Sequence, residues 1–166
     1  MNDGTASQSP DGQRKNTFAM VSFPVELDAV QTFENMHTTC CGRDSYVLDN
    51  SPFYAHGISV GDTVAADKID GRLVFNRVLK RSGHSTYRVK LRVGQTHEFF
   101  LQNWGKLAAL GCSYEGSTAG KRLLYSIDVP KTSDVYAVYA ALQAGEDNSL
   151  WEFEEAHYCK PDEHPT

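Results

Sequence analysis

The segment RSGHSTYRV, residues 81–89, concentrates side chains that can bind an anion. It combines arginines, hydroxyl groups, a glycine and a histidine. Backbone N–H groups, hydroxyls and guanidinium groups that converge in one turn can hold a phosphate or a carboxylate. The candidate ligand-binding residues are Arg77, Arg81, Ser82, Gly83, His84, Ser85, Thr86 and Arg88.

The same segment can also be interpreted as a turn between two strands. Ser82-Gly83-His84 lies between RLVFNRVLK and YRVKLRV, and it suits a hairpin connection because glycine and histidine both tolerate positive φ. Ser85 and Thr86 can bond to the turn backbone. Because glycine-containing turns of this kind are common, we expect the structural turn and keep the anion site as the alternative.

Histidines and cysteines suggest two further kinds of chemistry, a zinc site and a thiol nucleophile. The possible ligands form two clusters, His37-x-x-Cys40-Cys41 and His157-x-Cys159, enough for tetrahedral zinc. The clusters are far apart in sequence, however, and adjacent cysteines in a strand point to opposite faces. A nucleophilic thiol needs a nearby base and a lowered pKa, whereas Cys112 follows an expected helix end, which raises the pKa. We therefore predict no metal, no cofactor and no catalytic residue, and we expect reduced, packed cysteines.

An acidic run near the C-terminal end, LWEFEE at 150–155, suggests a binding face for a partner. The candidate partner-binding residues are Glu152, Glu154 and Glu155. If this strand lies antiparallel to residues 87–93, its carboxylates face the basic row Arg88, Lys90 and Arg92. Asp128 would flank that row on its other side. We favour this internal charge pairing, although each exposed pair contributes only about 0 to 1 kcal/mol.

The segment NSPFYAHGISVGD, residues 50–62, offers aromatic side chains among small residues. Phe53, Tyr54 and His56 could form the lip of a pocket. Alternatively, Phe53 anchors the loop in the core while Gly61-Asp62 turns the chain into the next strand. We favour the anchor, because buried aromatic side chains pack more often than they contact ligands.

Strand patterns dominate the first half of the chain. Apolar runs at 17–23, near 30–36 and at 45–49 each have the length of a strand. In TVAADKIDGRLVFNRVLK, Asp70-Gly71 separates two apolar runs, and both residues tolerate the positive φ that a tight hairpin requires. These short strands predict a curled antiparallel sheet or a small barrel.

The second half mixes strands with helices. Residues 87–93 alternate strictly, and one face carries Val89, Leu91 and Val93. Apolar spacing predicts a helix at 96–110, with Gly111 at the position of a C-terminal glycine. Two strands follow, in CSYE and RLLYSIDV.

A second helix and a last strand complete the pattern. The helix should begin at Thr132 or Ser133, either of which can cap it, and end at Gly145. Its apolar positions have helical spacing: Val135, Val138, Tyr139 and Leu142. The strand at 150–155 comes last, so the order is β-α-β-β-α-β, the split βαβ arrangement of ferredoxin-like domains.

The bulk properties are those of a globular α+β protein. A chain of 166 residues can bury one core or two small ones. We predict a disordered tail at 1–16, a β-rich subdomain at 17–86, a ferredoxin-like subdomain at 87–158 and a C-terminal tail at 159–166. The net charge of −5 argues against a nucleic-acid partner, and the sequence shows neither a signal peptide nor a membrane span. We expect a cytoplasmic protein.

Several motifs, in this order, resemble those of a bacterial family named domain of unknown function 4265. They are LDNSPFYAHGISVGDTV, RSGHSTYRV, LGCSYEG, IDVP leading into a helix, and LWEFEEA. The resemblance covers roughly residues 18–158. The resemblance implies a bacterial, soluble, single-domain protein and carries over no activity or catalytic residue. The chain departs from the family pattern at ENMHTTCCGRDS, where relatives usually have a tryptophan-containing segment. His84 stands where relatives often have asparagine.

Three classes of function follow from these observations. The first is a non-catalytic bacterial binding protein, most concretely an immunity or antitoxin-type protein that binds and masks a cognate toxin. The second is a regulatory domain that binds a small anion or metabolite, and the third is an enzyme that uses the His/Cys or Arg/Ser/Thr residues. We favour the first, with a toxin or other bacterial protein as partner and neither a nucleic acid nor a membrane, because the sequence lacks the common catalytic motifs.

Overall fold

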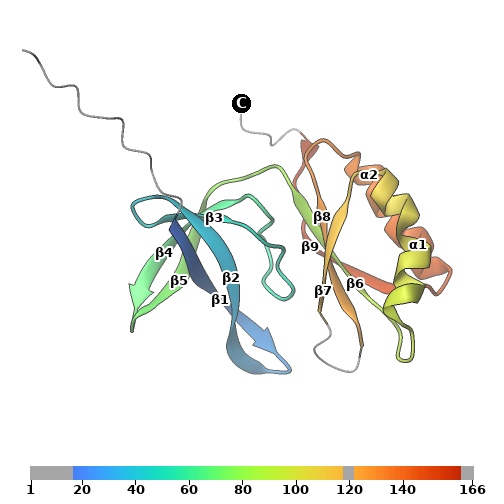
Figure 1. The fold of residues 1–166 in the computed structure, drawn as a ribbon, viewed down its shortest axis with the longest axis horizontal. Coiled ribbons are helices and arrows are strands. Elements are labelled where there is room, and N and C mark those ends of the chain that lie inside the picture. Colours follow the sequence, from blue (N-terminus) through green and yellow to red (C-terminus); the bar gives the residue numbers. More distant parts are fainter. Residues whose placement is uncertain (1–16, 118–121, 162–166) are drawn as a thin grey trace, which may run out of the picture.

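The structure, a computed structural model of the chain, describes residues 17–117 and 122–161. It is a mixed α+β fold made mostly of strands, and it has a barrel lobe and a sheet lobe (Figure 1). The predicted tail at 1–16 lies outside the described residues, as do residues 162–166 of the predicted C-terminal tail.

The barrel lobe is a closed barrel of consecutive strands. These are β1 (Thr17–Leu27), β2 (Val30–Gly42), β3 (Ser45–Leu48), β4 (Thr63–Ile69) and β5 (Arg72–Lys80). Neighbours pair antiparallel along the chain, and β1 closes the barrel by pairing parallel with β5 at Val21 and Ser22. Apolar side chains fill the interior, with Val21, Met36, Leu48 and Val64 almost completely buried. The prediction of a β-rich, barrel-like first half is confirmed.

The turn from β4 to β5 follows the sequence pattern closely. Ile69 pairs with Arg72 across it, and Asp70 and Gly71 have φ values of 48° and 80°. Positive φ at both central positions gives the backbone twist that a two-residue hairpin needs. The predicted hairpin at Asp70-Gly71 is confirmed.

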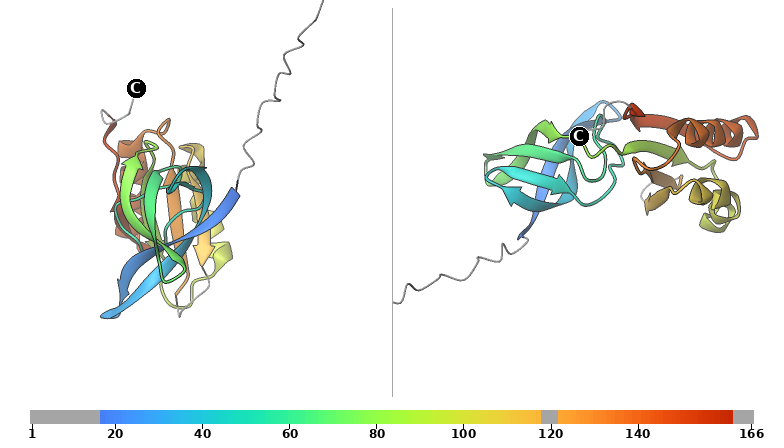
Figure 2. Two further views of the ribbon diagram at one scale, coloured as in Figure 1. Left: turned by 90° about the vertical axis from the view of Figure 1, so that its left-hand side faces the viewer. Right: turned by 90° about the horizontal axis from the view of Figure 1, so that it is seen from above.

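The sheet lobe follows the predicted order of strands and helices. Its elements are β6 (Ser85–Lys90), α1 (His97–Ala109), β7 (Ser113–Ser117), β8 (Leu124–Val129), α2 (Val135–Asp147) and β9 (Glu152–His157). The strands form an antiparallel sheet in the order β7-β8-β6-β9. Both helices lie on the face of this sheet that points away from the barrel (Figures 1 and 2).

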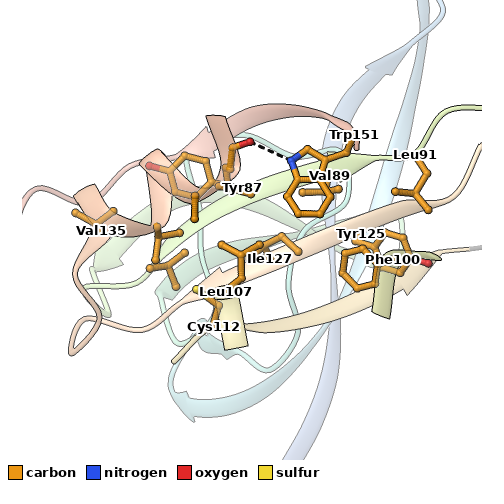
Figure 3. Close-up of a cluster of buried hydrophobic side chains, with 14 residues drawn as sticks. Tyr87, Val89, Leu91, Phe100, Leu107, Cys112, Tyr125, Ile127, Val135 and Trp151 are labelled. Atoms are coloured by element: carbon orange, nitrogen blue, oxygen red, sulfur yellow. Dashed lines mark hydrogen bonds between the residues drawn. The ribbon is translucent and has the colours of Figure 1, made fainter. Parts of the chain in front are cut away.

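A hydrophobic core joins these helices to the sheet (Figure 3). Phe100 of α1 stacks on Tyr125 of β8, with ring centroids 3.7 Å apart. Trp151 is almost completely buried, and its indole N–H donates to the carbonyl of Leu142 at 3.0 Å. Because the helices take one face for this core, the opposite face is left for the barrel and its loops.

Helix ends agree with the sequence in α1 and differ in α2. Gly111 follows α1 at φ 88°, as predicted. The cap of α2 is Asp134, whose carboxylate accepts from two backbone N–H groups, so the prediction of Thr132 or Ser133 is wrong. Gly145 does not end α2 but lies inside it. A glycine is needed there because the Trp151 ring occupies the space that a side chain would fill.

Two strand predictions at the lobe boundary are wrong. Ser82-Gly83-His84 is not a hairpin, because β5 belongs to the barrel and β6 to the sheet. It is the connection between the lobes. Val93 is 77% exposed, because β6 ends at Lys90 and the alternating pattern outlasts the strand. Local patterning identified both strands but did not select their partners.

Candidate functional site

In the long loop between β3 and β4, residues 49–62, three consecutive backbone amides bind one carboxylate of the barrel. We call this segment the interlobe loop, and it lies between the two lobes in Figure 1. The Glu34 carboxylate of β2 accepts from the backbone N–H groups of Phe53 at 2.6 Å, Tyr54 at 3.0 Å and Ala55 at 2.7 Å. Convergent amides of this kind form an anion-binding concavity, and here the anion is part of the chain.

The same loop is bonded to the sheet lobe on its other side. The Ser126 hydroxyl donates to the carbonyl of Pro52 at 2.7 Å. The Ser59 hydroxyl lies 2.7 Å from that of Thr86, and the amide of Gly57 donates to the carbonyl of Ala156 on β9 at 2.9 Å. These bonds fix the barrel against the helix-free face of the sheet.

Asp62 anchors the connection between the lobes from inside the loop. It is completely buried. Its carboxylate accepts from the guanidinium of Arg81 at 2.9 Å and from the amides of Ser82 at 2.8 Å and Ser59 at 3.1 Å. The Arg81 guanidinium also donates to the carbonyl of Gly57 at 2.6 Å. The charge of Arg81 is therefore balanced within the chain.

The remaining residues predicted as an anion site are placed in different surroundings. His84 Nδ1 lies 2.8 Å from the Asp128 carboxylate. Asp128, which was expected to flank the basic row of β6, thus pairs with His84. The Ser85 hydroxyl accepts from the amide of Cys159 at 2.9 Å. Arg77 is exposed on β5, opposite Ala65 in the barrel. Arg81, Ser82 and Thr86 also bond within the chain. In this structure the segment therefore connects the two lobes through contacts with other parts of the chain.

The His84–Asp128 pair predicts a pH-dependent stability. The hydrogen bond to Asp128 raises the pKa of His84, although burial opposes the shift. A raised histidine pKa stabilises the fold fully below the ordinary value of about 6.5 and stops doing so as the pH rises through the higher folded value. We expect His84→Asn to reduce the free energy of unfolding more at pH of about 6 than of about 9, as measured by urea unfolding. An equal loss at both pH values would contradict this. As the control, His84→Asn made in an Asp128→Asn background should reduce the free energy of unfolding equally at the two pH values.

The cysteines are divided between the two lobes. None of the four is assigned to a disulfide among the described residues: Cys40 and Cys41 belong to the barrel lobe, and Cys112 and Cys159 are buried in the sheet lobe. Burial, with a smaller effect of Asp128, raises the pKa of the Cys112 thiol to about 12. The direction agrees with the sequence analysis, but its main cause is burial rather than the helix end. The described residues contain no group of three or more His, Cys, Asp or Glu side chains that is arranged to hold a metal.

A cleft of about 740 Å³ opens between the barrel and the helix-free face of the sheet. Three segments line it. The tip of the β1–β2 hairpin contributes Glu26, Leu27 and Asp28, and the interlobe loop contributes Phe53, Tyr54 and His56. The sheet, with the segment just before β8, contributes Arg88, Lys90, Arg122, Leu124, Glu152, Phe153 and Glu154.

Arg88 is the most enclosed charge at the cleft, with a side chain only 4% exposed. Its guanidinium donates to Glu154 at 2.8 Å, to His56 Nε2 at 3.2 Å and to the carbonyl of Ala55. Its Nε–H is buried and has no hydrogen-bond partner among the described residues. Because a guanidinium only donates, His56 Nε2 accepts and the ring proton lies on Nδ1. Arg88 thus ties both lobes together at the back of the cleft.

The acidic strand β9 pairs with basic residues of the same sheet. Glu154 lies opposite Arg88 and bonds to it, as the charge-pairing interpretation predicts. Glu152 lies opposite Lys90, but its ion pair at 3.0 Å is with Arg122. This hydrogen bond to Arg122 is the main reason why the pKa of Glu152 is lowered. Glu155 is exposed on the same strand.

The lining of the cleft combines a buried arginine, exposed charges of both signs and apolar surface, the mixture by which pockets orient a ligand.

Of the sheet wall, the sequence analysis named Arg88, Glu152 and Glu154 as candidates. It gave the wall formed by the interlobe loop only as the alternative to a core anchor at Phe53, and it missed the hairpin wall. Phe53, Tyr54 and His56 line the cleft, in the place of the alternative pocket lip, while the loop is anchored by the buried residues Ala55 and Ile58. Sequence analysis missed the carboxylates at the hairpin tip and Arg122, since they lie at distant positions that give no local signal. The turn at the hairpin tip has positive φ at Asp28 and Ala29, but alanine is not enriched at positive φ, so no turn pattern marks this tip in the sequence.

Comparison with solved structures shows a shared fold. The chain is similar to the protein titled "Novel crystal structure of a hypothetical protein from Neisseria gonorrhoeae", with a TM-score of 0.69 and 15% sequence identity, over 90% of this chain and 99% of that one. No curated protein matches the chain significantly. Within the described part of the chain, no helix has the length and apolar character needed to cross a membrane.

A family model covers most of the elements that build the cleft. The model, described as Domain of unknown function (DUF4265), matches residues 34–153. This range begins at Glu34, which holds the interlobe loop, and it includes that loop and Arg88. The chain belongs to the DUF4265 family.

Proposed function

We propose that this chain is a non-catalytic binding protein whose ligand occupies the cleft between the β1–β2 hairpin and the sheet. The observation that carries the proposal is the buried Arg88 at this cleft, with its Nε–H unpartnered among the described residues. A buried donor without an acceptor costs about 1 to 3 kcal/mol. The volume of about 740 Å³ falls within the range of about 300 to 1,000 Å³ typical of small-molecule sites.

The architecture supports a preformed site. The interlobe loop is bonded to Glu34 on one side and to Ser126 and Ala156 on the other. A site whose walls are fixed before binding loses less conformational entropy when the ligand arrives. A small anion or metabolite is thus the form of ligand that we favour.

Masking of a protein partner is the second candidate, and the acidic strand favours it. β9 is the terminal strand of the sheet, and Glu152, Glu154 and Glu155 are exposed on it. An acidic strand at the edge of a sheet suits a basic partner, as in an immunity or antitoxin-type protein of the bacterial cytoplasm. We rank it second because the carboxylates of Glu152 and Glu154 already hold Arg122 and Arg88.

We also propose that the sheet lobe is ferredoxin-like. Its order β-α-β-β-α-β and its antiparallel arrangement β7-β8-β6-β9 support this assignment, since two split βαβ units interleave in that way. Open faces of such sheets host ligands in other proteins, which is support by analogy of fold alone.

A cleft-filling variant tests the proposed function. Leu124 lines the sheet wall, and we expect Leu124→Trp to displace a ligand that copurifies with the full chain, as read by native mass spectrometry. Leu79, which is 44% exposed on β5, gives the control Leu79→Trp, which should keep the ligand. Retention of the ligand by a folded Leu124→Trp protein would place the site elsewhere. A stoichiometric protein partner that both variants keep would favour masking instead.

A further inference from the structure

We propose that the ligand of this cleft is dipolar, with an anionic group held by Lys90 and a cationic group held by Glu26 and Asp28. The inference rests on the proposed function and names the class of molecule that the cleft would take. It follows from counting which charges of the lining are already balanced within the chain.

On the sheet wall, Lys90 is the cation without an ion pair among the described residues, although its charge acts on Glu152 across the strands. Arg88 is balanced by Glu154 at 2.8 Å, and Arg122 by Glu152 at 3.0 Å. Lys90 is exposed on the same face of β6, and no carboxylate of the described residues lies within 4.0 Å of its ammonium group. An anionic group that enters the cleft therefore meets Lys90 as its free partner.

The hairpin wall keeps charges of the opposite sign. The Glu26 carboxylate accepts a hydrogen bond from the neutral amide of Gln31 at 2.6 Å, which leaves its charge in place. Asp28 begins the turn, with φ values of 50° for Asp28 and 62° for Ala29. Within the described residues, neither carboxylate has an ion-pair partner. A turn with positive φ at both central residues is well defined, so the backbone places both exposed residues at the tip of the hairpin.

The space between the two walls is partly apolar. Leu27, Tyr54 and Leu124 line it, and all three are half-buried. A hydrocarbon spacer between the two charged groups would bury against these side chains. A ligand with two anionic groups would meet repulsion at the hairpin, and one with two cationic groups would meet repulsion at Lys90, so the cleft selects by exclusion as well as by attraction.

Probes of equal chain length separate these alternatives. We expect ε-aminocaproate, which carries both charges, to bind the full chain about tenfold more tightly than adipate or hexamethylenediamine in calorimetry at low salt, because each of those loses one favourable contact and gains a repulsive one. Lys90→Glu should shift the preference to hexamethylenediamine, and Asp28→Lys should shift it to adipate. Lys80→Glu, on the exposed surface of β5, should change nothing.

The outcomes separate this inference from the proposed function. Tightest binding of adipate or of hexamethylenediamine by the unmodified chain would overturn the dipolar assignment, and so would the failure of all three probes to bind. In those cases the proposed function would still be supported if Leu124→Trp displaced a copurified ligand. If ε-aminocaproate bound the Leu124→Trp protein unchanged, the site would lie outside the cleft and both proposals would be wrong.

Discussion

Asp62→Ala is expected to lower the free energy of unfolding by about 3 kcal/mol, because it removes a buried carboxylate that holds three partners. Two of these partners are backbone amides, of Ser59 and Ser82, and they would be left inside the protein without an acceptor. The third, Arg81, has a side chain 36% exposed and can recover hydration, which keeps the loss at the lower end of the range for a broken buried pair. The measurement is urea unfolding of the full chain near neutral pH.

Two variants make this test specific. Asp62→Asn keeps one accepting oxygen but replaces the other with a donating NH2 group, so it should cost less than the alanine variant without matching the original protein. Asp67→Ala removes an exposed carboxylate of β4 that bonds only to Asn76 among the described residues, and we expect a loss below about 0.5 kcal/mol. If Asp62→Ala behaved like Asp67→Ala, the interlobe loop would not depend on the buried carboxylate.

Much of the fold could be predicted because it is encoded locally. The Asp70-Gly71 hairpin needs only two residues that tolerate positive φ between apolar runs, and the structure confirms it. The charge pairing of Arg88 with Glu154 was also predictable, since the order of elements places β9 against β6. The prediction of a hairpin at 82–84 was wrong for the same reason, because it too used only local sequence. The connection between the lobes has the residue types of a hairpin turn, and only the long-range pairing of β5 and β6 distinguishes the two.

The candidate site could be predicted only in part, because it depends on contacts between distant segments. Alternation along β6 places Arg88 on a polar face, yet the residue is buried because the interlobe loop, from a different part of the sequence, covers that face. The hairpin tip at Glu26 and Asp28 lines the same cleft as β8 and β9, which come about 100 residues later in the chain. No pattern in either segment indicates the other.

Gly145→Ala is expected to destabilise the protein by about 1 to 3 kcal/mol, the usual cost of overpacking a filled core. A Cβ atom built on Gly145 would lie 2.3 Å from the ring carbons of Trp151. The ring cannot retreat easily, because it is buried and its N–H is bonded to the carbonyl of Leu142 (Figure 3). Urea unfolding should show a lower midpoint with an unchanged slope.

The other helix supplies a matched control. Gly105 lies in α1 with open space around the position of a Cβ atom, so Gly105→Ala should stabilise the protein by up to about 1 kcal/mol through helix propensity. In a Trp151→Leu background the cost of Gly145→Ala should shrink, because the clashing ring is gone. An undiminished cost in that background would show that the ring is not the cause.

The interlobe loop also sets an order of events during synthesis. A chain made from its N-terminus completes the barrel strands before β8 and β9 leave the ribosome. Until then the carbonyl of Pro52 and the amide of Gly57 bond to water, because Ser126 and Ala156 have not yet been translated. Docking of the lobes therefore has to wait for β8 and β9, and a nascent chain that stalls before β9 lacks the strand that completes the cleft.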